Sequence, residues 1–340
     1  MAIQRAAVLG GGSFGTVIAN LMARNGLKVT LWMRNQDAVN DIASNRTNSH
    51  YLPDLVLHEN LTATTSLGQS VEQADLVFVA VPSASCRQVA RDFAAHIKAG
   101  VGVVSTTKGI EETSFLLMSQ VLQEELTEAK VGVLSGPNLA KEIADEQFAG
   151  TVIASPYPEL NLDVHNAMST GHFKVYSGND TFGVELGGAL KNIYAIVCGM
   201  AKALQTGENT FGLLLTRGLA EMSRFAVHLG ANPLTFIGLA GVGDLVVTCN
   251  SPLSRNFRVG FALGEGKDLD QVVAELGQVA EGVRTLKIVK HKADEEGIYM
   301  PMVSALYQVI YENASIDQVV GEMMSGEQNQ DVEFVWAPNA

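Results

Sequence analysis

Cysteine is scarce in this sequence. The chain of 340 residues has three, Cys86, Cys198 and Cys249, which are widely separated and odd in number. That pattern fits neither a disulfide framework nor a cysteine zinc site. The seven histidines show no metal-ligand spacing, so the sequence predicts no metal site. Such cysteine usage is typical of proteins of a reducing cytoplasm.

Long apolar runs are also missing. No uninterrupted apolar stretch reaches the length needed to span a membrane. The first apolar run, at residues 6–9, is only as long as a strand, so the N-terminus does not show the charged-then-apolar pattern of a secretory signal. We therefore expect a soluble cytoplasmic protein without integral membrane association.

Positive charge is in short supply. Lysine and arginine number 23 against 36 aspartates and glutamates, and the formal net charge is −13. This balance argues against nucleic acid or an anionic membrane surface as the main partner. An anionic substrate would have to be held by a local cluster of cations.

A glycine-rich turn follows the first apolar run. Residues 10–15 read GGGSFG, the spacing G-x-G-x-x-G, and a helical pattern follows at 16–24. In this context Gly10 permits a tight turn, Gly12 lets a pyrophosphate approach the backbone, and Gly15 lets the helix pack closely on the strand. The motif predicts a nicotinamide- or flavin-dinucleotide site. A turn that merely packs a helix on a sheet is the alternative.

The second predicted strand ends in a cation. Sites selective for NAD usually have Asp or Glu there to bind the ribose hydroxyls, whereas this chain has Arg34. A cation favours the 2′-phosphate of NADPH. Asp37 could still reach the ribose, and Arg34 could be a solvated residue after a strand, so NADP(H), NAD(H) or both remain candidate cofactors.

The chain is long enough for two domains, and 47% hydrophobic against 17% charged residues argues against disorder. Its first half alternates apolar strands with helical patterns, which is typical of a parallel sheet covered on both faces. From about residue 183 the apolar positions recur at helical spacing. We predict an α/β protein, with a Rossmann-type, doubly wound, mostly parallel sheet at 1–182 and an all-helical substrate-binding and catalytic domain at 183–340. The expected strands are 6–9, 28–33, 61–63, 75–81, 101–105, 131–134, 151–154 and 173–176. The expected helices are 16–24, 84–97, 114–126, 184–205, 211–229, 233–239, 256–263, 269–276, 282–296, 301–311 and 316–324.

Lys191 lies in a segment that is apolar on every side. A helix of that kind is usually buried. A buried lysine is costly unless it is paired or its pKa falls. The segment therefore suits a general acid or base, and a structurally ion-paired lysine is the equally open alternative.

Other candidates lie at turns. Lys108 follows a predicted strand at the edge of the sheet where ligands bind, from which its ammonium could reach the nicotinamide end of a cofactor. A surface lysine that merely follows a strand is the equally open alternative. Asp244 is a lone carboxylate in a small, apolar run, and it fits either catalysis or a helix N-cap. Ser254, Arg255 and Asn256 open a predicted helix and could bind a phosphate, or could form a plain N-cap with an exposed arginine.

Seven motifs follow one another along the chain: GGGSFGT at 10–16, TKG at 107–109, SGPNLAKE at 135–142, GGALKN at 187–192, TRGLAE at 216–221, GVGDL at 241–245 and SRN at 254–256. In this order they resemble the motifs of bacterial NAD(P)-dependent sn-glycerol-3-phosphate dehydrogenases. The resemblance covers nearly the whole chain. Phe14 departs from the Tyr or Trp that is common in the family, and Asn138 from the usual Thr or Ser.

The resemblance implies reversible hydride transfer between NAD(P)H and dihydroxyacetone phosphate, which yields sn-glycerol 3-phosphate for glycerophospholipid synthesis. It makes Lys191 the general acid and base at the C2 oxygen, Lys108 a group that polarises and positions the substrate, and Asp244 a group that orients both substrate and lysine. The implied substrate-binding residues are Lys108, Gly136, Asn138, Lys191, Asp244, Ser254, Arg255 and Asn256. The implied cofactor-binding residues are Gly10, Gly12, Ser13, Phe14, Gly15, Arg34, Lys108, Ala140, Arg255, Val279 and Glu281.

Two alternatives stay open. A related dehydrogenase with the same layout could act on a hydroxy acid or a sugar acid phosphate. A nucleotide-binding sensor could keep the fold without catalysis. A homodimer is one possible assembly.

Overall fold

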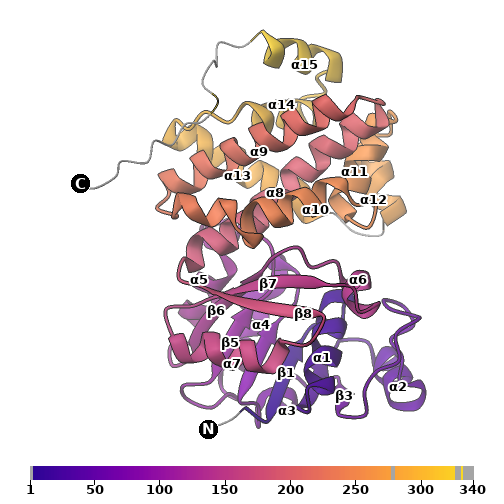
Figure 1. The fold of residues 1–340 in the computed structure, drawn as a ribbon, viewed down its shortest axis with the longest axis vertical. Helices are drawn as coiled ribbons and strands as arrows, with labels where there is room; N and C mark the ends of the chain where they lie inside the picture. Colours follow the sequence, from indigo (N-terminus) through magenta and orange to yellow (C-terminus); the bar gives the residue numbers. More distant parts are fainter. Residues whose placement is uncertain (1–2, 277–279, 326–330, 332–340) are drawn as a thin grey trace. The chain divides into compact units, whose positions relative to one another are not determined.

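The computed structural model describes residues 3–276, 280–325 and 331. The chain forms two compact units, Met1–Glu185 and Leu186–Ala340, each with its own core. The division falls within helix α8 (Thr181–Ala203), which is continuous in Figure 1. Among the described residues, no helix is both long enough and apolar enough to cross a membrane.

The first unit contains an eight-stranded sheet in the order β3-β2-β1-β4-β5-β6-β7-β8. Neighbouring strands are parallel except β6 and β7, so the predicted mostly parallel sheet is confirmed. The strands are β1 (Arg5–Leu9), β2 (Lys28–Trp32), β3 (Leu61–Thr64), β4 (Leu76–Val79), β5 (Gly102–Ser105), β6 (Lys130–Ser135), β7 (Ala149–Ala154) and β8 (Phe173–Gly178).

Helices cover both faces of this sheet (Figure 1). Alternate residues of β1 enter different cores: Val8 packs in the cluster that includes α1 and α7, and Leu9 in the cluster that includes α4 and α5. This alternation follows from the two-residue period of a strand. The helices of the unit before α8 are α1 (Ser13–Arg24), α2 (Gln36–Asn45), α3 (Leu67–Val71), α4 (Ser83–Ala94), α5 (Met118–Glu125), α6 (Ala140–Ala144) and α7 (Pro158–Met168).

The antiparallel strand has a simple cause. The link between β6 and β7 contains only the five-residue helix α6. The crossover that joins parallel neighbours usually contains a helix long enough to carry the chain back along the sheet. The chain therefore turns back beside β6.

All regular secondary structure among the described residues of the second unit is helical. Helix α8 is its buried centre, as its apolar pattern predicts. Near one crossing, a Cβ at Gly199 would collide with the carbonyl of Phe257, and a Cβ at Gly260 would collide with that of Ile196. The other helices are α9 (Glu208–His228), a 3-10 helix η1 (Pro233–Ile237), a π-type turn η2 (Leu239–Gly243), α10 (Asp244–Asn250), α11 (Arg255–Gly264), α12 (Leu269–Leu276), α13 (Glu281–Glu296), α14 (Pro301–Tyr311) and α15 (Ile316–Met324).

Candidate active site

The glycine turn lies where the chain order of the sheet reverses. After β3 the chain crosses to β4, on the other side of β1. Gly10 has φ +124°, and a Cβ there would collide with the carbonyl of Ala80, just after β4. A Cβ at Gly15 would collide with the carbonyl of Gly10. The turn thus occupies the crevice in which sheets of this type bind nucleotides.

Gly12 is different, because its α-carbon faces open space. A Cβ there would meet no atom of the described residues within 4 Å. Gly12 is also the N-cap of α1, whose first N–H groups have no partners within the helix. Ser13 and Phe14 form the start of that first turn. The residues present therefore fit a dinucleotide pyrophosphate.

Asn48 stabilises this turn through hydrogen bonds, a role that the sequence did not predict. Its Nδ2 donates to the carbonyl of Gly11 at 3.0 Å and to Thr16 Oγ1 at 2.8 Å. Ser13 Oγ donates to the carbonyl of Tyr51 at 3.4 Å. Asn48 lies in a polar stretch between α2 and β3, and such a stretch gives no sign of which turn it packs against.

Arg34 follows β2 and is exposed. Its Cζ lies 6.0 Å from the centroid of the Trp32 ring, which is within range of a cation–π contact. Because β1 and β2 are parallel, with Leu9 opposite Trp32, Arg34 lies at the same edge of the sheet as the glycine turn. Asp37 lies in the first turn of the adjacent helix α2, which Asn35 caps.

Lys108 follows β5 at this edge and is half-buried. Its Nζ donates to the carbonyl of Gly136, which follows β6, at 3.3 Å. Asn138 has both polar atoms engaged, since Nδ2 donates to Gly150 O at 3.1 Å and Oδ1 accepts from Thr151 Oγ1 at 2.9 Å. Ala140 begins α6 immediately afterwards. The structure therefore brings Lys108, Gly136 and Asn138 together at the ends of adjacent strands.

In the second unit, Lys191 is 5% exposed and Asp244 is 1% exposed. Lys191 Nζ, on α8, donates a hydrogen bond to Asp244 Oδ1, and the two side chains form an ion pair. Nζ also donates to Thr248 Oγ1 at 2.7 Å, and that hydroxyl lies 3.2 Å from Asp244 Oδ1. The three side chains form one buried polar cluster, which holds the ammonium in a fixed place.

The cluster depends on the shape of the chain before α10. Gly241 has φ −100° and ψ −105°, outside helical values, and a Cβ there would collide with the backbone of Phe236. Gly243 is the N-cap of α10, and Asp244 is its first residue. Asp244 is therefore not the N-cap that the sequence left open. Its carboxylate instead reaches Thr248, one turn along the same helix.

Ser254, Arg255 and Asn256 lie where two helices begin. Ser254 caps α11, and its Oγ accepts from Phe257 N at 3.3 Å. Arg255 is exposed at the first position of that helix. Asn256 Oδ1 accepts from Gly282 N, in the first turn of α13, at 3.0 Å. The N-termini of α11 and α13 are thus joined, and both ends attract anions.

The N-termini of α11 and α13 lie beside the backbone next to Lys191. A Cβ at Gly282 would collide with Asn256 Oδ1 and approach the carbonyl of Asn192, the residue after Lys191, at 2.7 Å. Glu281 begins α13 beside Gly282. Val279, expected at the cofactor, lies outside the described residues.

Two buried glutamates cap helices in the two units. Glu185 accepts from Ser119 N, at 2.9 Å, and from Ser119 Oγ in the first turn of α5. Glu221, on α9, accepts from Met302 N at 3.0 Å and from Val303 N at 2.9 Å in the first turn of α14. Burial raises the pKa of each carboxyl from 4.5 to about 7, although these hydrogen bonds oppose the rise.

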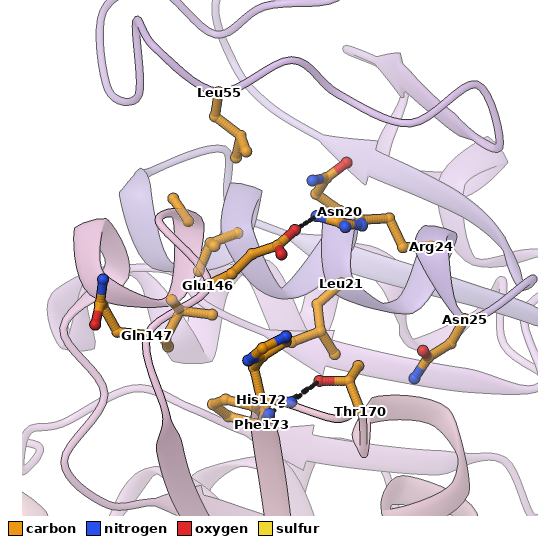
Figure 2. A pocket seen from close by; sticks show the side chains of 13 residues that line it. Asn20, Leu21, Arg24, Asn25, Leu55, Glu146, Gln147, Thr170, His172 and Phe173 are labelled. Atoms are coloured by element: carbon orange, nitrogen blue, oxygen red, sulfur yellow. Dashed lines mark hydrogen bonds and ion pairs between the residues drawn. The ribbon is translucent and has the colours of Figure 1, made fainter.

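A cavity of about 250 Å³ lies in the first unit beside α1 and α6 (Figure 2). An ion pair between Arg24 and Glu146 spans it, and the Thr170 hydroxyl accepts from Phe173 N at 2.9 Å. None of the site residues expected from the sequence lines this cavity. It is separate from the glycine turn.

Thr248 was also missed in the sequence. The expected helices did not include residues 244–250, and a helix after Asp244 entered only as the N-cap alternative. The four-residue spacing therefore did not indicate that Asp244 and Thr248 lie on one helix face. Among the described residues, no group of three or more His, Cys, Asp and Glu side chains could hold a metal ion. The three cysteines are free and buried.

Comparison with known proteins identifies the family. The model "NAD-dependent glycerol-3-phosphate dehydrogenase N-terminus" matches residues 5–161, and the corresponding C-terminus model matches residues 180–321. The glycerol-3-phosphate dehydrogenase (NAD(P)+) of Saccharophagus degradans is 54% identical over 96% of this chain and 91% of its own length. The chain belongs to the NAD-dependent glycerol-3-phosphate dehydrogenase family.

Other members agree. The enzyme of the same name from Ectopseudomonas mendocina is 54% identical over 98% of both chains. The crystal structure of glycerol-3-phosphate dehydrogenase from Coxiella burnetii aligns with a TM-score of 0.90 and 35% identity, over 95% of this chain and 99% of that one. The predicted family, its enzyme class of NAD(P)-dependent dehydrogenase and its fold class are confirmed.

Proposed function

We propose that this protein reversibly reduces dihydroxyacetone phosphate to sn-glycerol 3-phosphate with NADPH or NADH. The observation that carries the proposal is the buried cluster of Lys191, Asp244 and Thr248, next to two joined helix N-termini that present Arg255. A fixed ammonium beside an anion site suits a small phosphorylated ketone.

Lys191 is the general acid in reduction. The bound nicotinamide supplies the hydride. As the ketone C2 gains this hydride, its oxygen becomes negative, and Lys191 Nζ donates a proton to it. In the reverse direction Nζ takes the proton from the C2 hydroxyl. Asp244 and Thr248 hold Nζ in position, and Asp244 balances its charge in a buried environment.

Lys108 assists by stabilising negative charge on the same oxygen. Preorganised cations of this kind lower the barrier because they need not reorient during reaction. The hydrogen bond to Gly136 fixes the direction of the side chain. Gly136 and Asn138 lie beside it as substrate-binding residues.

The phosphate group is bound by the start of α11. Arg255 supplies charge and a planar fork of donors, and the first turn after Ser254 supplies backbone N–H groups. Asn256 positions this turn against α13. A phosphate anchor also provides binding energy that orients the ketone.

The cofactor is held by Gly10, Gly12, Ser13, Phe14 and Gly15, with Lys108, Arg255, Ala140, Val279 and Glu281 as further contacts. Arg34 pairs with the 2′-phosphate of NADPH, so its replacement by alanine raises the KM for NADPH more than that for NADH. Equal effects on both coenzymes would rule out this role. The protein acts in the cytoplasm, where its free, buried thiols stay reduced. It also forms a homodimer, and a measurement of its molar mass in solution tests this assembly.

The direct test is an assay of the purified protein with dihydroxyacetone phosphate and either reduced coenzyme. We expect oxidation of the reduced coenzyme with this substrate and none with 2-keto acids, and we expect no reduction of NAD(P)+ with hydroxy acids or sugar acid phosphates. Turnover of those compounds instead would indicate a related dehydrogenase. Coenzyme binding with no turnover of any of them would indicate a sensor. Either result would overturn the proposal.

A further inference from the structure

The segment that carries Lys108 is fixed at its first end by two threonines. It runs from β5 to α5. Thr106 Oγ1 donates to the carbonyl of Val79 at 3.0 Å, and Thr107 Oγ1 donates to that of Val81 at 2.8 Å. Both threonines are buried. These hydrogen bonds hold the backbone immediately before Lys108 in place.

Glu111 lies three residues beyond Lys108, and Arg87 of α4 binds the segment through its carboxylate. Arg87 Nε and Nη2 each donate to one carboxylate oxygen of Glu111 at 2.7 Å. Such a two-pronged pair fixes orientation as well as distance. The pair holds the pKa of Glu111 below its ordinary value, so Glu111 stays charged at neutral pH.

Glu111 in turn organises the rest of the segment. Its carboxylate accepts from Ser114 Oγ at 2.6 Å, and its backbone N–H donates to Leu116 O at 2.9 Å. Ile110 is 4% exposed and forms a bridge with Leu117. Lys108 therefore lies between two anchored ends.

Arg87 is itself held by the next helix. Its Nη1 donates to Glu125 at 2.6 Å and pairs with Glu124 at 2.8 Å. The side chain is 23% exposed. Arg91, one turn further along α4, also pairs with Glu125, at 3.0 Å, but is 56% exposed. Among the described residues it affects Glu111 through its charge, whereas Arg87 forms hydrogen bonds with that carboxylate. The two arginines thus share a helix and a partner and differ in contact with Glu111.

We propose that Arg87 is a positioning residue for the reaction, which acts through Glu111 to set the place of Lys108. The proposal rests on the proposed function, in which Lys108 touches the substrate. It requires arginine, because a lysine cannot make the two-pronged pair.

The test compares Arg87→Ala with Arg91→Ala, which removes the same charge from the same helix. We expect kcat/KM for dihydroxyacetone phosphate to fall about 10- to 100-fold in Arg87→Ala, as a small displacement of a catalytic group can cause. Arg91→Ala should stay close to wild type. Thermal melting of both variants measures the structural effect, and Arg87→Lys serves if Arg87→Ala does not fold.

A double-mutant cycle separates positioning from general destabilisation. If Arg87 acts through Lys108, then Arg87→Ala adds little to the loss already caused by Lys108→Ala. The exchanged pair Arg87→Glu with Glu111→Arg should recover part of the activity of the single Arg87→Glu variant.

The outcomes are distinct. Equal kcat/KM in Arg87→Ala and Arg91→Ala, or full additivity with Lys108→Ala, would overturn the positioning role and leave the proposed function intact. Undiminished turnover in Lys108→Ala would instead contradict the role of Lys108 in the proposed function, and the inference would fall with it.

Discussion

The two units prepare their functional residues by opposite means. In Met1–Glu185 the dinucleotide turn depends on missing side chains at Gly10, Gly12 and Gly15. In Leu186–Ala340 the proposed chemistry depends on two charged side chains, Lys191 and Asp244, that are almost completely buried. A site lined by backbone tolerates no added atoms, whereas a buried ion pair tolerates no removed partner. We therefore expect an added side chain to impair the first site, and the loss of one charged partner to impair the second.

The largest effect is expected for the lysine. Lys191→Met removes the proton donor, and kcat should fall by about a thousandfold, within the range for loss of a general acid. It also leaves the Asp244 carboxylate buried without its partner, which costs about 3–5 kcal/mol of stability. Steady-state kinetics and urea unfolding measure the two effects.

The matched control is the double variant Lys191→Met/Asp244→Asn, which leaves neither charge of the pair. Its stability should return toward that of the wild type while its activity stays lost. Substantial turnover in this variant would contradict the assigned chemistry.

The next largest effect is expected for Gly12, in the glycine turn of the first unit. Gly12→Val adds atoms to a space that no described protein atom fills within 4 Å of the Cβ position. The fold should therefore remain stable, while the KM for NADPH should rise about tenfold or more, because the pyrophosphate needs close contact with the backbone. Gly171→Val is the control, since its Cβ position is also open. If the two variants have the same KM for NADPH, the turn does not bind the cofactor.

A smaller effect is expected for Thr248→Val. The change removes one hydrogen bond to Lys191 Nζ, which is 2.7 Å long. A bond to a charged group contributes about 1.5–3 kcal/mol, so kcat should fall about tenfold or somewhat more. Thr206→Val, at an exposed threonine of the same unit, should leave kcat unchanged. An unchanged kcat in Thr248→Val would show that Asp244 alone positions the lysine.

The last prediction concerns the dependence of stability on pH, and it leaves the residues proposed for catalysis unchanged. Glu185 and Glu221 each have a pKa of about 7 in the folded protein against 4.5 ordinarily. A raised carboxyl pKa favours folding at low pH, and that contribution is lost as pH rises from about 4.5 through about 7. Each group should cost up to about 3 kcal/mol over this interval. Stability should therefore decline between pH 5 and pH 8.

Urea unfolding of Glu185→Gln and Glu221→Gln at both pH values isolates each contribution. Either variant should lose less stability between pH 5 and pH 8 than the wild type loses. Glu72→Gln, at an exposed position, should behave as the wild type does. A wild-type slope in both buried variants would show that these carboxyls do not titrate near neutrality.

Much of the first unit could be predicted from its sequence. The expected strands are all present, because each is a short apolar run bounded by turn residues. The glycine turn could be predicted because backbone conformation at Gly10 and close packing at Gly15 require that residue type. The reversed direction of β7 could not, since it depends on the shortness of helix α6 in the link after β6.

The second unit was harder to predict. Most of its helices follow from apolar spacing, but α10 was not among the expected helices. In place of the single helix expected at 233–239, residues 233–237 form a 3-10 helix and residues 239–243 form a π-type turn. The pair between Lys191 and Asp244 joins residues 53 positions apart, so no local pattern reveals it. Thr248 and the cap from Asn256 to α13 depend on the same tertiary packing. The sequence could indicate that Lys191 needed a partner, but not which one.

Equilibrium binding of NADPH to Lys191→Met and Gly12→Val, measured with turnover of dihydroxyacetone phosphate in the same preparations, tests this contrast most directly. We predict that Lys191→Met binds NADPH with the wild-type Kd and has almost no turnover, while Gly12→Val binds NADPH weakly and recovers turnover at saturating coenzyme. Loss of NADPH binding in Lys191→Met, or wild-type binding in Gly12→Val, would contradict the division of labour between the two units.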